Sequence, residues 1–378
     1  MTEAFLAGTG VYLAPTSLSA DRFIEMDREM RICHGQSQDI LDSISKIVTG
    51  SQINSRPLIA PGWYPPGEGC SDLEGTNVPD IFTPNNFNPP AYLRAKFFYD
   101  FAPKMALLAA KKAIKSWGGK PEDISHVITT STSGWHEPGI AVHLIENLGL
   151  SHDTHKIELN FNGCFCGASC MRTARDIVKA GESKAVLVVA VELASTQYNI
   201  EDTSMSGLVA NALFSDGAGA VIVAPSGGWH YESAGMTTIP NTSQLLTFSP
   251  DMEKPATAYK MYLDKNIGRT IAKYFNEEAG KDLLNRLLKK VKKPPVLAIH
   301  QGGPDILTRV RFVFTNKFGW KKEDFTYTAD ALGTMGNLGS AAMLVILDKV
   351  LSKTNSDEIL CFAFGPGVTV EWSLLKKT

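Results

Sequence analysis

The chain contains 378 residues, of which 44% are hydrophobic and 20% are charged, and its formal net charge at pH 7 is -2. These values are ordinary for a globular protein with one large core or two medium-sized domains. The small net charge excludes a long-range electrostatic pull toward nucleic acid or an anionic membrane surface. The longest apolar runs, residues 185–191 and 341–347, are far shorter than the about 20 residues needed to cross a bilayer.

The chain begins without a basic region followed by an apolar one, which predicts a cytoplasmic protein with no secretory signal. Six cysteines in a chain of this length do not make a disulfide framework, so we expect a reducing environment. Cys164, Cys166 and Cys170 form a C-x-C-x3-C pattern. A structural metal site would need a fourth ligand at a matching spacing, and none lies nearby in the sequence, so we expect no metal.

In chain order, the first half alternates between extended and helical patterns. Residues 4–15 predict a strand, residues 21–33 and 40–47 predict helices, and residues 62–92 predict a long loop rich in Pro, Gly, Asn and Asp. Apolar residues at helical spacing predict a long helix over 91–117. The other predicted elements of this half are strands at 126–132, 156–161, 185–192 and 220–223, and helices at 139–148, 170–181 and 205–212.

The second half repeats this plan, whereas residues 226–295 carry no clear pattern. We therefore predict an internal duplication with two domains, residues 1–225 and 226–378. Strands that are continuously apolar and alternate with helices indicate an α/β protein whose sheet faces are both covered. The predicted elements of the repeat are strands at 296–300, 358–364 and 368–374, and helices at 304–318 and 336–351.

Cys164 lies between an extended run and a helical segment. Amide N–H groups at a helix start favour an anionic sulfur, so this position predicts a lowered thiol pKa. The sequence therefore suggests a covalent nucleophile. The alternative is a small buried apolar residue, which is what most free cysteines are.

His300 and Asn337 occupy matching places in the second half. Asn337 opens the helix that corresponds to the helix of Cys164, and His300 ends the strand that corresponds to the one before Thr132 and Ser133. If the halves pack sheet to sheet, these residues converge. A hydrolase triad would also need a group that orients the histidine as a base. A cysteine with two neutral hydrogen-bond donors is better suited to taking an acyl group from a thioester and stabilising an enolate, which favours carbon–carbon bond formation.

Five segments of the chain carry distinctive sequences, namely GCFCGA (163–168), LFSDGAGAVIV (213–223), HQGGPDIL (300–307), GNLGSA (336–341) and FGPGVTVEW (364–372). In this order and spacing, they resemble the type III polyketide synthases, the chalcone and stilbene synthase group. The resemblance implies a thiolase-like fold, a five-layer α/β/α/β/α sandwich built from two duplicated halves. His-x-Gly-Gly-Pro together with Gly-Pro-Gly separates this group from its ketoacyl synthase III relatives.

The resemblance also implies roles for single residues. It makes Cys164 the nucleophile, His300 and Asn337 the stabilisers of the thioester and enolate oxygen, and Phe214 a gatekeeper ring. Plain alternatives are a structural histidine, an Asn that caps a helix and a Phe of the core. Arg56, in a loop resembling the family's entrance, is a candidate contact for a CoA phosphate or an ordinary surface arginine. Further positions expected in the cavity wall are Thr132, Ser133, Gly365, Pro366 and Gly367.

The chain departs from the plant enzymes at several of these positions. Ala194 and Gln197, after Glu192, stand where the plant enzymes carry threonines, and Gly339 stands in place of a serine. Glu137 replaces a methionine that helps to form the dimer partner's cavity in the family, and Cys166 replaces a small residue. Residues 259–264 do not match the plant pattern, so no second gatekeeper phenylalanine is placed. We therefore expect Glu192, Ala194, Gln197 and Gly339 to bind substrate, and a starter unlike those of chalcone or stilbene formation.

The expected activity is an acyltransferase that condenses an acyl-CoA starter with malonyl-CoA, iteratively, to a pyrone or resorcinol-type product. The expected partners are these thioesters and, from the resemblance, a second copy in a homodimer, with no nucleic acid, no membrane and no dissociable organic cofactor. One alternative is a ketoacyl synthase III-like enzyme that makes a single condensation. A catalytically silent thiolase-fold partner protein is the other, against which the intact Cys164, His300 and Asn337 argue.

Overall fold

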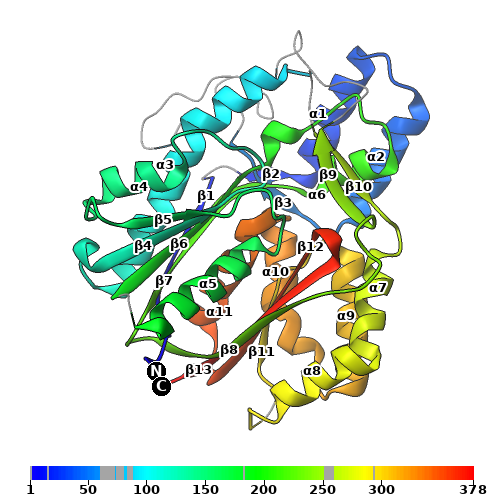
Figure 1. Ribbon diagram of the computed structural model, residues 1–378. Coiled ribbons are helices and arrows are strands. Elements are labelled where there is room, and N and C mark those ends of the chain that lie inside the picture. The colour runs from blue at the N-terminus through cyan, green and yellow to red at the C-terminus, as the bar shows by residue number, and fades with distance from the viewer. Residues whose placement is uncertain are drawn as a thin grey trace.

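Nine strands form the largest sheet of the computed structural model, which describes residues 2–14, 17–59, 73, 81–82, 88–181, 184–250, 259–292 and 294–378 (Figure 1). Most of the predicted loop at 62–92 lies outside the described residues. In the order in which they hydrogen-bond, the strands are β11 (Val296–Ile299), β12 (Glu358–Gly365), β13 (Thr369–Lys377), β8 (Trp229–Thr238), β1 (Phe5–Leu13), β7 (Asp216–Ala224), β6 (Ala185–Leu193), β4 (Ile124–Thr130) and β5 (His155–Glu158).

The order and direction of the strands repeat in the two halves of this sheet. In the first half, β4 pairs parallel with β6, β6 antiparallel with β7, and β7 antiparallel with β1. In the second half, β11 pairs parallel with β12, β12 antiparallel with β13, and β13 antiparallel with β8. Strand β5 extends the first half beyond β4, and β1 pairs with β8 to join the halves. The topology therefore shows the same unit twice.

Helices cover both faces of each sheet half because neighbouring residues of a strand point to opposite faces. Val188 of β6 packs in a cluster with α5 and α11, whereas Val189 packs with α3 and α4. Cys361 of β12 also packs with α5 and α11, whereas Phe362 packs with α7, α8 and α9. The covering helices are α3 (Ala91–Trp117), α4 (Ile140–Leu148), α5 (Cys166–Ala180), α7 (Ile267–Asn276), α8 (Glu278–Leu288), α9 (Pro304–Lys317) and α11 (Ala342–Lys353).

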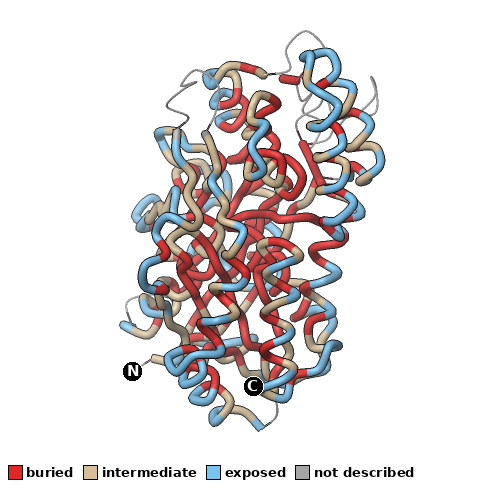
Figure 2. Tube along the Cα trace, turned by 90° about the vertical axis from the view of Figure 1, so that its right-hand side faces the viewer, coloured by how far each residue is buried: buried red, intermediate tan, exposed pale blue. Residues whose placement is uncertain are grey.

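Helices α5 and α11 therefore form a central layer shared by both halves, and the result is the five-layer α/β/α/β/α sandwich that the sequence predicted (Figure 1). Strands β6 and β7 are buried along their whole lengths, and buried segments fill the middle of the molecule in Figure 2. The remaining elements lie at one end of the sandwich or between its layers. They are α1 (Ala20–Cys33), α2 (Gln38–Gly50), α6 (Met205–Leu213), α10 (Thr326–Met335), and two small sheets made of β2 (Ser17–Ser19) with β3 (Ser55–Pro57) and of β9 (Leu246–Pro250) with β10 (Tyr259–Leu263).

The predicted helix over 336–351 is wrong at its start. Helix α10 ends at Met335, and α11 begins only at Ala342. Between them, Gly336 and Gly339 adopt positive φ angles of 63° and 54°, which an α-helix does not accommodate. Asn337 therefore lies in a turn before the helix and does not open it.

The described residues of the stretch 226–295, which carried no clear pattern, form five elements. They are β8, the β9–β10 hairpin, α7 and α8. Strand β8 lies between β13 and β1 and is only partly buried, so its sequence lacks the continuous apolar run of a central strand. The predicted helix over residues 91–117 is confirmed, since α3 has the same bounds. None of the described helices has the length and apolar character that a bilayer crossing requires.

The central layer generates a test of the packing. A Cβ atom on Gly167 of α5 would lie 2.3 Å from the main-chain oxygen of Ser340, just before α11. Gly167→Ala should therefore destabilise the protein by about 1–3 kcal/mol, although alanine is normally the better helix former. Gly50→Ala in α2, where the added atom meets open space, is the matched control and should be neutral or stabilising. Urea unfolding measures both; equal stabilities for the two variants would contradict the close approach.

Candidate active site

Cys164 lies in the turn that leads into the central helix α5. A main-chain hydrogen bond from Cys166 N to Gly163 O, 3.0 Å long, closes this turn. The turn packs against the loop after β12, since a Cβ atom on Gly163 would lie 2.3 Å from Pro366 Cδ. The loop of the second half therefore helps to fix the position of a thiol that belongs to the first half.

The surroundings of Cys164 favour the thiol over the thiolate. Burial raises the pKa of Cys164 to about 12, the negative charge of Glu192 acts in the same direction, and a main-chain hydrogen bond only partly opposes them. Helix α5 begins at Cys166, after Cys164. The prediction of a lowered thiol pKa is therefore wrong for the resting protein, because desolvation of the charged form outweighs the one opposing main-chain hydrogen bond.

His300 and Asn337 form a hydrogen-bonded pair of neutral side chains. His300 is buried directly after β11, and its Nε2 lies 3.2 Å from Asn337 Oδ1. Because that oxygen only accepts, the contact assigns the imidazole proton to Nε2. His300 Nδ1 has no hydrogen-bond partner in the described ranges. Burial lowers the pKa of His300 to about 4, against an opposing effect of the Asn337 contact, so the ring is neutral at pH 7.

Asn337 is held at the junction of the two halves. Its main-chain N–H donates to Leu213 O at 2.8 Å, and its own carbonyl accepts from Ser215 N at 2.9 Å, which makes an isolated parallel bridge with Phe214. Its side-chain Nδ2 donates to Gly302 O at 3.1 Å. The structure thus brings Phe214, the predicted gatekeeper, beside Asn337.

Asn337 also caps the short turn that follows it. Oδ1 accepts from Gly339 N at 3.0 Å as well as from His300 Nε2. One oxygen accepts both bonds because a carbonyl oxygen has two lone pairs. The alternative that Asn337 is the N-cap of a helix is wrong, since Leu338 and Ala341 hold the N-cap positions that follow, and its catalytic role stays a prediction.

Glu192, at the end of β6, is a buried carboxylate that collects main-chain and hydroxyl donors. It accepts from Thr132 N (3.1 and 3.2 Å), Ser133 N (3.0 Å), and the main-chain N (3.1 Å) and Oγ (2.5 Å) of Ser340. These bonds tie the turn after β4 and the turn before α11 to the end of β6. Glu192 therefore positions the cavity wall and has few free acceptor positions for substrate.

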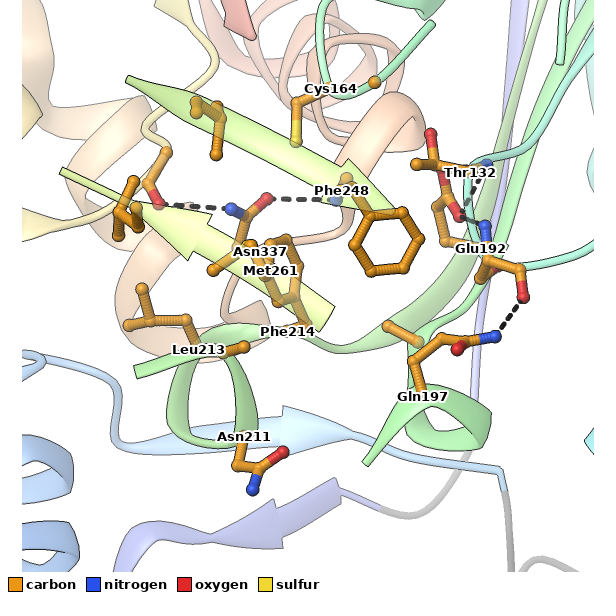
Figure 3. A pocket seen from close by; sticks show the side chains of 18 of the residues that line it. Thr132, Cys164, Glu192, Gln197, Asn211, Leu213, Phe214, Phe248, Met261 and Asn337 are labelled. Carbon is orange, nitrogen blue, oxygen red and sulfur yellow. Dashed lines mark hydrogen bonds between the residues drawn. The ribbon is translucent and has the colours of Figure 1, made fainter. Parts of the chain in front are cut away.

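A single cavity contains Cys164, His300 and Asn337, with Thr132, Glu192 and Gln197 on a further wall (Figure 3). Including its opening to solvent, the space is about 1410 Å³. Of the predicted wall residues, Gly367 does not line it; its carbonyl instead accepts from Thr242 Oγ1 at 2.9 Å. The predicted residues that do line it are Phe214, Thr132, Ser133, Glu192, Ala194, Gln197, Gly339, Gly365, Pro366 and Arg56.

The β9–β10 hairpin supplies a cavity wall that sequence reasoning missed. Leu246 and Phe248 of β9 and Met261 and Leu263 of β10 all line the cavity (Figure 3). They stand at alternate positions, so the period-2 pattern of a strand with one buried face was present in the sequence. Met261 lies in residues 259–264, the stretch in which the sequence placed no second gatekeeper, and it lines the cavity together with Phe248.

Arg56, in β3, is not a surface residue. Its side chain is buried, stacks over the Phe23 ring at 4.1 Å, and donates from Nη1 to Asn211 O and Phe214 O, each at 2.9 Å. These bonds hold the turn between α6 and β7 that carries Phe214. The predicted phosphate contact does not fit this placement, because a guanidinium bound to buried carbonyls does not reach out to a solvated phosphate.

Two family models match the chain. The model of the N-terminal domain of chalcone and stilbene synthases matches residues 78–227, and that of the C-terminal domain matches residues 231–378. The chain belongs to the chalcone and stilbene synthase family. It has the thiolase-like fold of a type III polyketide synthase, and its enzyme class is an acyltransferase that forms carbon–carbon bonds, as the sequence predicted.

Solved structures of similar proteins show the same fold over the full length of this synthase. PKS-I from the brown alga Ectocarpus siliculosus is 23% identical, with 100% of this chain and 99% of that chain covered and a TM-score of 0.86. A type III pentaketide synthase from Neurospora crassa is 23% identical, with coverages of 99% and 100% and a TM-score of 0.83. CsyB complexed with CoA-SH is 22% identical, with coverages of 99% and 100% and a TM-score of 0.82.

The resting charge state of the synthase can be tested by alkylation. Because the pKa of Cys164 is raised, the thiolate fraction is small at pH 7 and grows about tenfold per pH unit until the pH reaches that pKa. We expect the rate of Cys164 modification by iodoacetamide, followed by peptide mass spectrometry, to rise across the alkaline range. Glu192→Gln removes the neighbouring negative charge and should shift the whole profile to lower pH.

The control for this experiment is Asp176→Asn, at an exposed carboxylate further along α5. In that variant, iodoacetamide should modify Cys164 at the same rate as in the protein without a substitution. Two results would contradict the assigned charge state. One is a rate of Cys164 modification that is already maximal at pH 7, and the other is a pH profile of that rate that is the same in Glu192→Gln.

Proposed function

We propose that the protein is an iterative type III polyketide synthase that condenses an acyl-CoA starter with malonyl-CoA through an acyl group bound to Cys164. The observation that carries the proposal is the neutral His300–Asn337 pair, which lines the same cavity as a thiol. Both side chains can donate hydrogen bonds, and neither supplies the charge of a strong base.

In the first step, the sulfur of Cys164 attacks the thioester carbonyl of the starter. The carbonyl carbon forms a bond to Cys164, and its bond to the CoA sulfur breaks. CoA leaves as a thiol with the proton that Cys164 gives up, so charge balances without a metal or an external base. That CoA thioesters are the substrates is supported by CsyB, which is similar over its full length and is complexed with CoA-SH.

In the second step, malonyl-CoA loses its carboxylate as carbon dioxide. The electron pair of the broken carbon–carbon bond passes to the thioester as an enolate, whose oxygen needs hydrogen-bond donors. His300 Nε2–H, which donates to Asn337 Oδ1 in the resting protein, is one donor once the enolate oxygen replaces Asn337 Oδ1 as its acceptor. Asn337 Nδ2 has two hydrogens, of which Gly302 O takes only one, so it offers a second donor.

The enolate carbon then attacks the acyl group on Cys164. A carbon–carbon bond forms, the carbon–sulfur bond breaks, and the released thiolate is ready to accept the lengthened chain from CoA. In the described residues, no carboxylate bonds to His300 Nδ1, so the site lacks the orienting acid of a hydrolytic triad. This favours condensation over hydrolysis of the acyl intermediate.

The cavity favours more than one extension. It reaches from Cys164 past Phe214 to the β9–β10 hairpin, and its wall there is apolar, with Leu246, Phe248 and Met261. A growing chain can therefore be kept from water while Cys164 is acylated again. We propose that the product cyclises to a pyrone or resorcinol-type compound.

We also propose that the protein is a homodimer. Trp135 and Phe161 are 58% and 43% exposed, and both line a shallow hollow with Glu137. Exposed aromatic side chains that are grouped in this way are typical of protein interfaces. A second copy covering them would remove this apolar surface from water.

The activity is tested by incubating short, aromatic and long-chain acyl-CoAs with malonyl-CoA and measuring the product masses. We expect at least one starter to gain two or more C2H2O units, and Cys164→Ala to yield no elongated product. A single extension with every starter would indicate a ketoacyl synthase III-like enzyme, and no product at all would indicate a silent partner protein. Sedimentation of the same preparation should show a dimer; a monomer alone would contradict that part of the proposal.

A further inference from the structure

The peptide between Gly336 and Asn337 sets where the Asn337 side chain begins, and its own residues do not fix its orientation. Gly336 has a φ of 63° and a ψ of -149°. Glycine adopts such angles because it has no Cβ atom, and for the same reason it adopts many others. Hydrogen bonds from outside the turn must therefore hold this peptide in place.

Two hydrogen bonds hold opposite edges of the peptide. On one edge, Asn337 N–H donates to Leu213 O at 2.8 Å. On the other edge, Gly336 O accepts from Gln301 Nε2 at 2.7 Å. Since a peptide is planar and its N–H and C=O point in opposite directions, the two bonds together fix its rotation. Gln301 directly follows His300, and its side chain is buried.

The turn after β11 and the turn after α10 are also joined through the side chain of Asn337. Asn337 Oδ1 accepts from His300 Nε2 at 3.2 Å, and Asn337 Nδ2 donates to Gly302 O at 3.1 Å (Figure 3). Under the proposed function, the enolate oxygen replaces Asn337 Oδ1 as the acceptor of the His300 hydrogen bond. The direct link between the two donors is then open, whereas the bond from Gln301 to Gly336 uses neither of their side chains and is retained.

We propose that Gln301 is a positioning residue, which keeps the donors of His300 and Asn337 at a fixed separation while their mutual hydrogen bond is open. It acts through the carbonyl of Gly336 and does not line the cavity. The inference rests on the proposed function and adds to it the residue that holds the site in register when the enolate oxygen is bound.

The environment of Gln301 gives the side chain little net effect on stability. Its Oε1 is buried and has no hydrogen-bond partner in the described parts of the chain. The cost of one unpaired buried acceptor is similar in size to the gain from one neutral hydrogen bond. An apolar side chain of the same length should therefore leave the free energy of unfolding nearly unchanged and alter only the geometry of the site.

Gln301→Met keeps the length of the side chain and removes the bond to Gly336 O. We expect its kcat for the release of carbon dioxide from malonyl-CoA to fall about tenfold, because the rate is sensitive to small displacements of positioned groups. KM for malonyl-CoA and the melting temperature should stay unchanged. Gln301→Ala, which cannot clash with its neighbours, should show the same split between kcat and KM, although its smaller side chain lowers the melting temperature.

Gln36→Met is the matched control. Gln36 Nε2 also donates to a main-chain carbonyl, that of Ile200, at 2.6 Å, and its Oε1 accepts from the buried Arg31. Its melting temperature should fall because Arg31 loses a partner, while kcat stays unchanged. The proposal is overturned if Gln301→Met keeps the full kcat, if it raises KM alone, or if its kcat falls only in proportion to the folded fraction.

Crystal structures of Cys164→Ala and of Cys164→Ala/Gln301→Met, each with acetyl-CoA, keep this inference separate from the proposed function. The peptide between Gly336 and Asn337 should be displaced in the double variant alone, and an unmoved peptide overturns the positioning whatever the rates. If the protein without a substitution releases no carbon dioxide but the peptide moves, the proposed function is refuted and the positioning holds. If release is as fast in Gln301→Met and the peptide is unmoved, the positioning is refuted and the proposed function holds.

Discussion

The contact between the two halves at the central helix layer is the constraint on which the site depends. Gly167 of α5 lies so close to the main-chain oxygen of Ser340 that a methyl group does not fit between them. Cys164 precedes this contact on one side, and Asn337 precedes it on the other. The bridge between Asn337 and Phe214 adds a second link a few residues away. A thiol from the first half and an amide from the second are thus held together by backbone packing.

Burial then sets the chemistry of these side chains. Desolvation raises the pKa of Cys164 to about 12 and lowers that of His300 to about 4, so both are neutral in the resting protein. Glu192 is the nearby charge, and its oxygens are occupied by donors from Thr132, Ser133 and Ser340. Under the proposed mechanism, these neutral donors in a largely apolar cavity stabilise an oxygen that becomes negative during the reaction, and they offer little to activate water.

The sequence predicted the layered fold and the three central residues, since apolar periodicity defines strands and helices and the motifs around Cys164, His300 and Asn337 are distinctive. It did not predict features that depend on distant partners. The thiol pKa follows from burial and from Glu192, and the place of Asn337 follows from positive φ angles at Gly336 and Gly339. The sequence suggested that Arg56 lies at the cavity entrance, because its sequence neighbours do not show that it donates hydrogen bonds to the carbonyls of Asn211 and Phe214. Strands β9 and β10 have a period-2 pattern of apolar residues, but each strand is too short for the pattern to be distinguished in the sequence.

The proposed mechanism requires His300 and Asn337 to stabilise an enolate that forms without the cysteine. The most direct measurement is the rate of carbon dioxide release from malonyl-CoA by Cys164→Ala, His300→Ala and Asn337→Ala. We expect Cys164→Ala to continue releasing carbon dioxide, and each of the other two variants to lose about 10²–10³-fold in rate, as when one donor to a developing oxyanion is removed. Unchanged release by the folded His300→Ala and Asn337→Ala proteins would contradict it.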